Sequence, residues 1–207
     1  LLPKNRAVIT PTIENSLAVI SFENQTGEKS LDHLQKVIPN LLITNLENTG
    51  YFYVVTWERM HDLLKQIGKG NVEVIDKELG FELCRMEGVE SIILGSYAKA
   101  GNMFATDVKV IDVRTKKLLS STSAKGEGAD SILKTQIDEI SRDISLGKGI
   151  ASQKIESEKT EIINVTTSSM EAYSYFLMGK EAYRKKFYSE ARQLYEKALE
   201  LDPTFAS

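Results

Sequence analysis

Histidine and cysteine are scarce in this chain of 207 residues, which holds two histidines and one cysteine. A single cysteine, Cys84, cannot form an intramolecular disulfide and leaves no cysteine cluster for zinc or an iron–sulfur centre. His33 and His61 lie on different predicted helices without a second ligand four residues away, so we interpret both as solvated helix residues. Cys84 is expected to be a small core residue. We therefore predict neither a metal site nor a cofactor.

A surplus of basic residues is also missing, because 26 lysines and arginines are outnumbered by 29 aspartates and glutamates. Proteins that bind nucleic acids usually carry a basic patch or stripe, so no nucleic-acid partner is predicted. The phosphate-binding loop G-x-x-x-x-G-K-[ST] and the H-R-D and D-F-G motifs of protein kinases are absent from the sequence. We therefore predict that these residues form no enzyme active site.

The first residues contain neither an initiating methionine nor the long apolar run of a signal peptide or membrane span. We interpret the sequence as a segment of a longer protein, and expect any membrane attachment to lie in segments outside it. Residues 1–16 contain two prolines and little periodicity, which predicts an N-terminal arm or linker. A cytoplasmic location and the extracytoplasmic side of a membrane-anchored protein both fit these features.

Residues 17–147 alternate between strand-like and helix-like patterns. Runs of apolar, β-branched or alternating residues predict strands at 17–22, 51–56, 91–98, 103–112 and 118–125. Three- and four-residue spacing of apolar residues predicts helices at about 30–46, 57–67, 74–87 and 131–146. Pro39 predicts that the first helix is kinked there or begins there, and Gly88 is predicted to end the third. The order indicates an α/β fold with a mixed sheet of about five strands flanked by helices.

A ligand cleft of an open α/β sheet lies at the carboxyl ends of its strands. Asn24, Thr26 and Trp57 follow the strands predicted at 17–22 and 51–56. These three residues are therefore the candidate cleft if the chain is a small-molecule-binding regulatory domain.

A helical hairpin is predicted at 168–207, after a polar linker at 148–167. Ser168 and Glu171 form a capping box at its start, and Asp202-Pro203 ends its second helix. The spacing resembles the tetratricopeptide repeat, a helix–turn–helix unit of about 34 residues. The residues at the repeat's motif positions are Tyr175, Met178, Gly179, Ala191, Tyr195, Ala198 and Pro203. Ala182 departs from the pattern, because a tyrosine is usual there.

The resemblance implies that the first helix of the hairpin points side chains into a concave groove that holds partner peptides. The corresponding positions are Tyr173, Phe176, Lys180, Tyr183 and Arg184. Alternatively, the three aromatic side chains pack on the α/β part or on a second copy of the chain, since one hairpin cannot bury its own apolar surface. The sequence stops where a next repeat would begin, so we interpret the hairpin as the first unit of a truncated array.

The segments 17–28, 37–69 and 88–119 together resemble the TolB amino-terminal-like domain of bacterial signalling proteins. In that family the domain precedes tetratricopeptide repeats and often follows a Ser/Thr protein kinase or a nucleotide cyclase. The resemblance implies a non-catalytic protein-interaction or sensory module in the C-terminal part of such a chain. A small-molecule-binding regulatory domain and a dimerising structural spacer stay open as alternatives.

Overall fold

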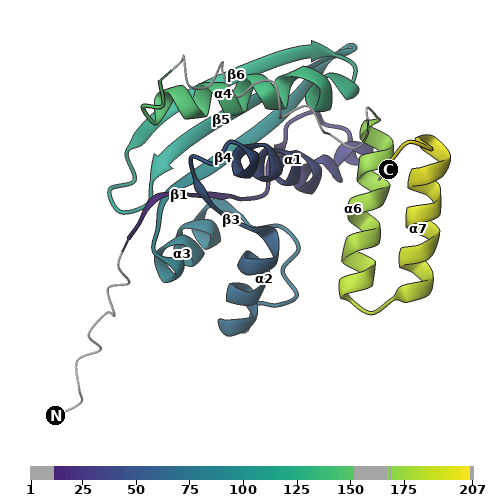
Figure 1. Cartoon of the computed structure of the whole chain (residues 1–207), viewed down its shortest axis with the longest axis horizontal. Coiled ribbons are helices and arrows are strands. Elements are labelled where there is room, and N and C mark those ends of the chain that lie inside the picture. The colour runs from purple at the N-terminus through teal and green to yellow at the C-terminus, as the bar shows by residue number, and fades with distance from the viewer. Residues whose placement is uncertain (1–11, 152–166, 168, 206–207) are drawn as a thin grey trace.

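The structure of the chain, a computed structural model, describes residues 12–151, 167 and 169–205 (Figure 1). Within these ranges a sheet flanked by helices is followed by a pair of helices that lie side by side. The predicted fold class, a mixed α/β sheet followed by a helical hairpin, is confirmed. Most of the predicted linker at 148–167 lies outside the described residues.

The sheet has six strands in the order β3-β1-β4-β5-β6, with β2 paired to β4. The strands are β1 (Ile13–Val19), β2 (Glu23–Asn24), β3 (Tyr53–Val55), β4 (Val89–Ala100), β5 (Met103–Asp112) and β6 (Leu118–Glu127). β1 is parallel to β3 and β4, whereas β5 is antiparallel to both of its neighbours, β4 and β6. The sheet is therefore mixed, and its two antiparallel connections are the short polar turns of hairpins.

The first strand begins at Ile13, four residues before the predicted start at 17. Residues 13–16, predicted as part of an N-terminal arm, therefore belong to the sheet. Asn15 has a φ of 53°, and the register with β4 shifts between Ile13 and Leu17. The hydroxyl of Ser16 accepts a hydrogen bond from the Glu90 amide at 2.8 Å. A bulged start with polar residues has no apolar run, and the sequence pattern therefore missed it.

Six α-helices surround the sheet or form the hairpin in the described part of the chain. They are α1 (Leu34–Asn48), α2 (Trp57–Gln66), α3 (Lys77–Glu87), α4 (Ile137–Gly147), α6 (Met170–Arg184) and α7 (Tyr188–Leu201). The Thr56 hydroxyl caps α2 by accepting from the Arg59 amide at 3.2 Å, and the Asp76 carboxylate caps α3. Gly88 ends α3 with a φ of 77°, as predicted.

Pro39 lies inside α1, so the prediction that this helix begins at Pro39 is wrong. A proline has no N–H, which leaves the carbonyl of Gln35 without its helical donor. The amide of Phe22 donates to that carbonyl at 3.0 Å. Pro39 therefore does not leave a buried acceptor unpaired, and the start of α1 is joined to the segment that follows β1.

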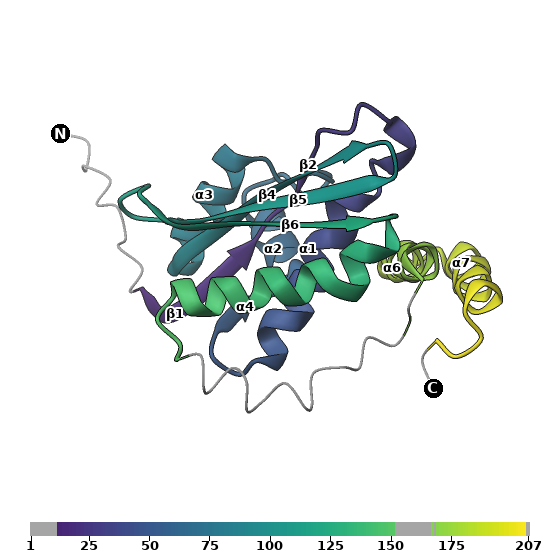
Figure 2. The same cartoon turned by 90° about the horizontal axis from the view of Figure 1, so that it is seen from above.

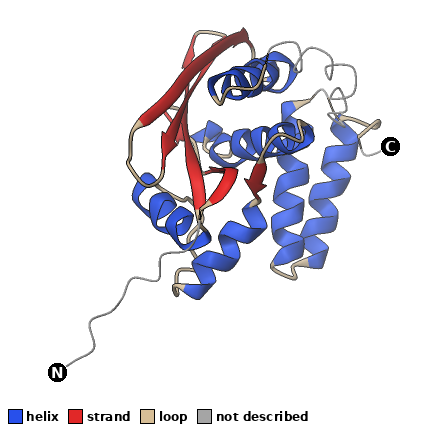
Figure 3. Cartoon of the chain, turned by 60° about the vertical axis from the view of Figure 1, so that its left-hand side comes forward, coloured by secondary structure: helices blue, strands red, loops and turns tan. Residues whose placement is uncertain are grey.

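Helices lie on both faces of the sheet (Figures 2 and 3), and each face carries an apolar core. One core joins the sheet to α1 and α4 and includes Met170 at the start of α6. The other joins β1 and β4 to α2 and α3. In β5, Phe104, Thr106, Val108 and Val110 point into the first core, as the predicted alternation requires. The hairpin thus packs beside α1, on the same side as the first core.

Candidate binding site

The first turn of α6 is anchored to the α/β part. Met170 is buried in the first core, and Tyr173 and Leu177 pack against that core. The amide of Met170 donates to the Asp130 carboxylate at 3.0 Å. Ser168, the predicted cap, lies outside the described residues, and the hydroxyl of Ser169 caps the helix by accepting from the Ala172 amide.

The two helices of the hairpin approach each other closely at Gly179. A Cβ at this position would lie 2.5 Å from the ring of Tyr195, so only glycine fits without a shift. Ala191 and Ala198 on α7 are buried, and Pro203 follows the end of that helix. Tyr175 lies beneath the ammonium group of Lys197, whereas the side chain of Met178 is 47% exposed.

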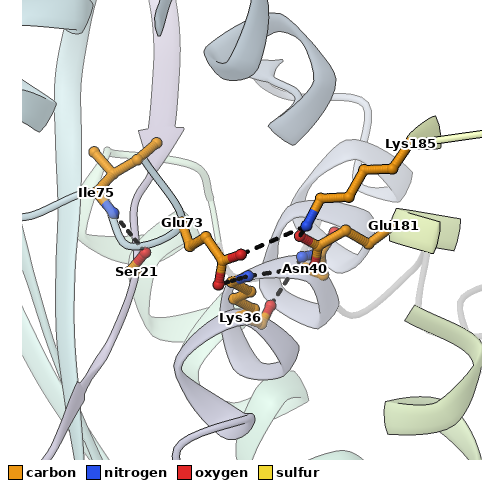
Figure 4. A network of polar contacts seen from close by, with 7 residues as sticks. All are labelled: Ser21, Lys36, Asn40, Glu73, Ile75, Glu181 and Lys185. Atoms are coloured by element: carbon orange, nitrogen blue, oxygen red, sulfur yellow. Dashed lines mark hydrogen bonds and ion pairs between the residues drawn. The ribbon is translucent and has the colours of Figure 1, made fainter. Parts of the chain in front are cut away.

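A network of ion pairs joins α6 to the α/β part (Figure 4). Lys36 on α1 pairs with Glu181 at 3.3 Å and with Glu73 at 3.6 Å. Lys185 pairs with the same two carboxylates, at 2.9 and 3.5 Å. Burial raises the pKa of Glu181, but the hydrogen bond from Lys185 and the charge of Lys36 outweigh it, and the net pKa is lowered. Glu181 thus joins α6 to α1, and Lys185, directly after α6, joins the hairpin to Glu73.

A cavity of about 920 Å³ lies between α1, α2, α6 and the loop at 73–74. Lys180, Tyr183 and Arg184 of the predicted groove line it, and so does Trp57 of the predicted cleft. Tyr195, Leu177 and Met178 add apolar surface from the hairpin. The concave face of the hairpin is therefore partly closed by the α/β part, and what remains is a bounded cavity.

Tyr173 and Phe176, two of the five predicted groove residues, do not line this cavity. Burial raises the pKa of Tyr173 to about 12, and a hydrogen bond with the Thr44 side chain opposes that shift. Phe176 lies between the rings of Tyr195 and Phe205, with centroids 5.9 and 5.0 Å away. These two aromatic side chains pack within the chain.

Asn24 and Thr26, predicted as cleft residues with Trp57, lie elsewhere. The side-chain oxygen of Asn24 accepts from the Thr26 amide at 2.9 Å and from its hydroxyl at 2.6 Å. Neither residue lines the cavity that contains Trp57. The structure therefore does not bring the three cleft residues together, because Asn24 and Thr26 shape the turn that follows β2.

His61 lines the cavity and is 6% exposed, so the prediction of a solvated side chain is wrong. Its ring stands edge-on to Trp57, with centroids 5.8 Å apart. Its Nδ1 has no hydrogen-bond partner among the described residues. Burial is the largest effect that lowers the pKa of His61, and the charge of Arg184 is the next. Glu181 raises this pKa by a smaller amount, whereas Lys36 and Lys65 lower it slightly. Trp57 and His61 are four residues apart, which places both rings on one side of α2. This spacing could have predicted from the sequence that His61 lies beside Trp57.

Exposed aromatic side chains gather at the turn of the hairpin. Tyr183, Phe187 and Tyr188 are 60%, 57% and 59% exposed. The rings of Tyr183 and Tyr188 meet edge to face with centroids 5.4 Å apart. Arg184 and Lys186 lie beside them and make no ion pair with a described residue. We call Tyr183, Arg184, Lys186, Phe187 and Tyr188 the turn cluster.

Neither a metal-binding cluster nor an accessible thiol is found among the described residues. They contain no group of three His, Cys, Asp or Glu side chains placed to hold a metal ion. Cys84 is fully buried, and burial raises its pKa to about 12, so it is a core residue as predicted. No helix in the described ranges is long and apolar enough to cross a membrane.

The hairpin is similar to a known type of helical repeat. Residues 172–205 match the tetratricopeptide repeat. The resemblance predicted for the hairpin is confirmed, and the matched span begins at Ala172, three residues before the predicted motif position Tyr175. No curated protein matches the chain.

Several solved structures are similar to parts of the chain at low identity. The LpoB C-terminal domain from Salmonella enterica is 17% identical, with a TM-score of 0.44, over 56% of this chain and 84% of that one. Lipoprotein GNA1162 from Neisseria meningitidis is 16% identical, with a TM-score of 0.47, over 63% and 96%. TolB from Acinetobacter baumannii is 12% identical, with a TM-score of 0.45, over 69% and 30%. At this level of similarity these structures do not bear on function.

Proposed function

We propose that the chain is a non-catalytic protein-interaction module that binds a polypeptide segment at the turn of its helical hairpin. The observation that carries the proposal is the turn cluster, with three aromatic side chains more than half exposed beside two cations. One exposed aromatic residue is ordinary on a protein surface, whereas a contiguous group is typical of an interaction site. Tyrosine and arginine are also the residue types enriched at the energetic centre of interfaces.

The cations of the turn cluster indicate the chemistry of the segment. Lys180 and Lys185 have carboxylate partners at 3.5 and 2.9 Å, but Arg184 and Lys186 make no ion pair with a described residue. An acidic segment with apolar or aromatic side chains would supply the missing charges and cover the exposed rings. The tetratricopeptide match at 172–205 supports a role in protein binding.

We also propose the kind of longer protein in which this chain occurs. The order of an α/β part at 17–147 and a repeat at 168–207 agrees with the resemblance to TolB amino-terminal-like signalling proteins. We infer on that basis a place in the C-terminal part of a Ser/Thr kinase-like or cyclase-like chain. The complete open reading frame tests this inference, because it requires a kinase or cyclase segment upstream of residue 1.

Selection from a peptide library displayed on phage tests the interaction. Enriched peptides are synthesised and titrated by fluorescence polarisation against the wild-type chain, a Tyr183→Ala/Tyr188→Ala variant, and Tyr53→Ala as a control. Tyr53 is 50% exposed on β3, outside the hairpin. We expect the turn variant to weaken binding about tenfold or more and the control to leave it unchanged. Equal affinity for all three proteins, or no enrichment of any peptide, would contradict the proposal.

The dimerising spacer stays a prediction. It requires a second copy to cover exposed surface of this chain, and static light scattering across a concentration series tests it. A monomeric mass at the highest concentration would contradict that alternative.

A further inference from the structure

The wall of the cavity between α1, α2 and α6 contains one cation whose charge is unmatched. Its lysines are paired: Lys36 with Glu73 and Glu181, and Lys180 with Glu58. The side chain of Arg184 forms neither a hydrogen bond nor an ion pair with any described residue, although it lines the cavity. A guanidinium group presents donors in a fork that matches a carboxylate, so an anionic group fits beside it.

The ring of His61 gives a second, independent indication of a ligand. The side chain is more than nine-tenths buried in the cavity wall, and its Nδ1 lacks a partner among the described residues. Leaving a buried polar atom unpaired is unfavourable, and an ordered water or a bound ion is a common explanation for such an atom in a native structure. The position of His61 beside Trp57 places this polar group against an aromatic wall.

The size and the remaining surface of the cavity fit a small molecule. Its volume of about 920 Å³ falls within the range of about 300–1,000 Å³ that is common for ligand sites. Trp57, Tyr183, Leu177 and Met178 supply an aromatic and apolar lining around the polar groups. Charged and polar side chains from α1, α2 and α6 lie among these apolar groups, and polar groups placed beside apolar surface can fix the orientation of a bound ligand.

We propose that this cavity binds a small organic carboxylate with an aromatic or apolar body. The carboxylate pairs with the Arg184 guanidinium, and the body lies against Trp57 and Tyr183. The site draws on both the α/β part and the hairpin, so the ligand bridges the two. It does not depend on the proposed polypeptide partner, because a small molecule occupies the cavity without any peptide.

Trp57 is the only tryptophan of the sequence, and its emission therefore reports on this cavity alone. Phenylacetate, phenylacetamide and phenethylamine are titrated into the chain with excitation at the red edge of tryptophan absorption. We expect a saturable change with phenylacetate and about tenfold or more weaker binding of the neutral amide and the amine. Arg184→Gln should weaken phenylacetate binding to the same degree, whereas Arg192→Gln on α7, an exposed control paired with Glu196, should not.

Three results would overturn the proposal: no saturable response to phenylacetate, equal binding of the carboxylate and the amide, or unchanged binding in Arg184→Gln. The comparison of the three probes uses the wild-type chain, so it decides the question even if a variant folds poorly. Loss of peptide binding in the library experiment would leave this result untouched, which keeps the two proposals separable.

Discussion

Replacing Gly179 with alanine tests how closely the two helices of the hairpin pack. The added Cβ would lie 2.5 and 2.6 Å from two carbons of the Tyr195 ring, well inside van der Waals contact. Tyr195 cannot move away freely, because its ring also contacts Phe176, which in turn contacts Phe205. The substitution therefore forces a displacement of the ring or of α7.

Two opposing effects set the size of the change. Alanine favours a helix over glycine by about 1 kcal/mol, which would stabilise α6 if the space were open. Overpacking a filled contact costs about 1–3 kcal/mol, and separations near 2.5 Å place this site at the upper end. We expect a net loss of about 1–2 kcal/mol in the free energy of unfolding.

Urea denaturation followed by circular dichroism measures this loss, with a double-mutant cycle that adds Tyr195→Leu. The smaller side chain removes the ring atoms that the new Cβ would meet, so the alanine should destabilise less in that background. A coupling of about 1 kcal/mol or more between the two positions is expected. If Gly179→Ala leaves the chain equally stable or more stable, the close approach at Tyr195 is refuted.

Three further predictions concern the contacts of the hairpin and the cores. Lys36→Met should lower the free energy of unfolding, measured by urea denaturation, by about 1 kcal/mol, because Glu73 and Glu181 lose a partly buried cation. The control Lys65→Met removes an exposed ion pair and should lower it by less than about 0.5 kcal/mol. Folding lowers the pKa of His61, so the free energy of unfolding should fall as the pH drops below 6.5, the usual histidine pKa. The fall should be smaller in His61→Gln, and parallel pH profiles of the two proteins would contradict this prediction. Cys84 should react with a thiol reagent on the order of a thousandfold slower in the folded chain than in urea, and rapid labelling without denaturant would be inconsistent with its burial.

Elements defined by local chemistry could be predicted from the sequence. The helix predicted at 57–67 begins at Trp57, and Gly88 ends α3 in the left-handed conformation that glycine adopts most readily. The alternation of β5 predicted its buried face because one face of that strand packs on a core. In each of these cases the residues that determine the structure are neighbours in the chain.

Elements defined by distant partners could not be predicted. Glu23 and Asn24 form β2 only because β4 offers a free edge more than seventy residues later, and their own side chains are polar. Pro39 is tolerated inside α1 because the Phe22 amide takes the place of the missing donor. Both depend on pairings that no local pattern contains.

The candidate site was predicted only in part for the same reason. Spacing within the repeat identified Lys180, Tyr183 and Arg184, which line the cavity, and also Tyr173 and Phe176, which pack inside the chain. Which positions stay open depends on how α6 lies against α1. That arrangement rests on contacts such as Lys36 with Glu181, between residues 145 positions apart.

The hairpin is held against the α/β part, and both parts therefore line the cavity proposed to bind a small carboxylate. Zero-length carbodiimide cross-linking with peptide mass spectrometry tests this arrangement, because only an amine and a carboxylate in direct contact are joined. In the monomeric chain we predict links between Lys36 and Glu181 and between Lys185 and Glu73, together with the reference link of Lys65 and Asp62 within α2. Formation of the reference link without either of the other two would contradict the account.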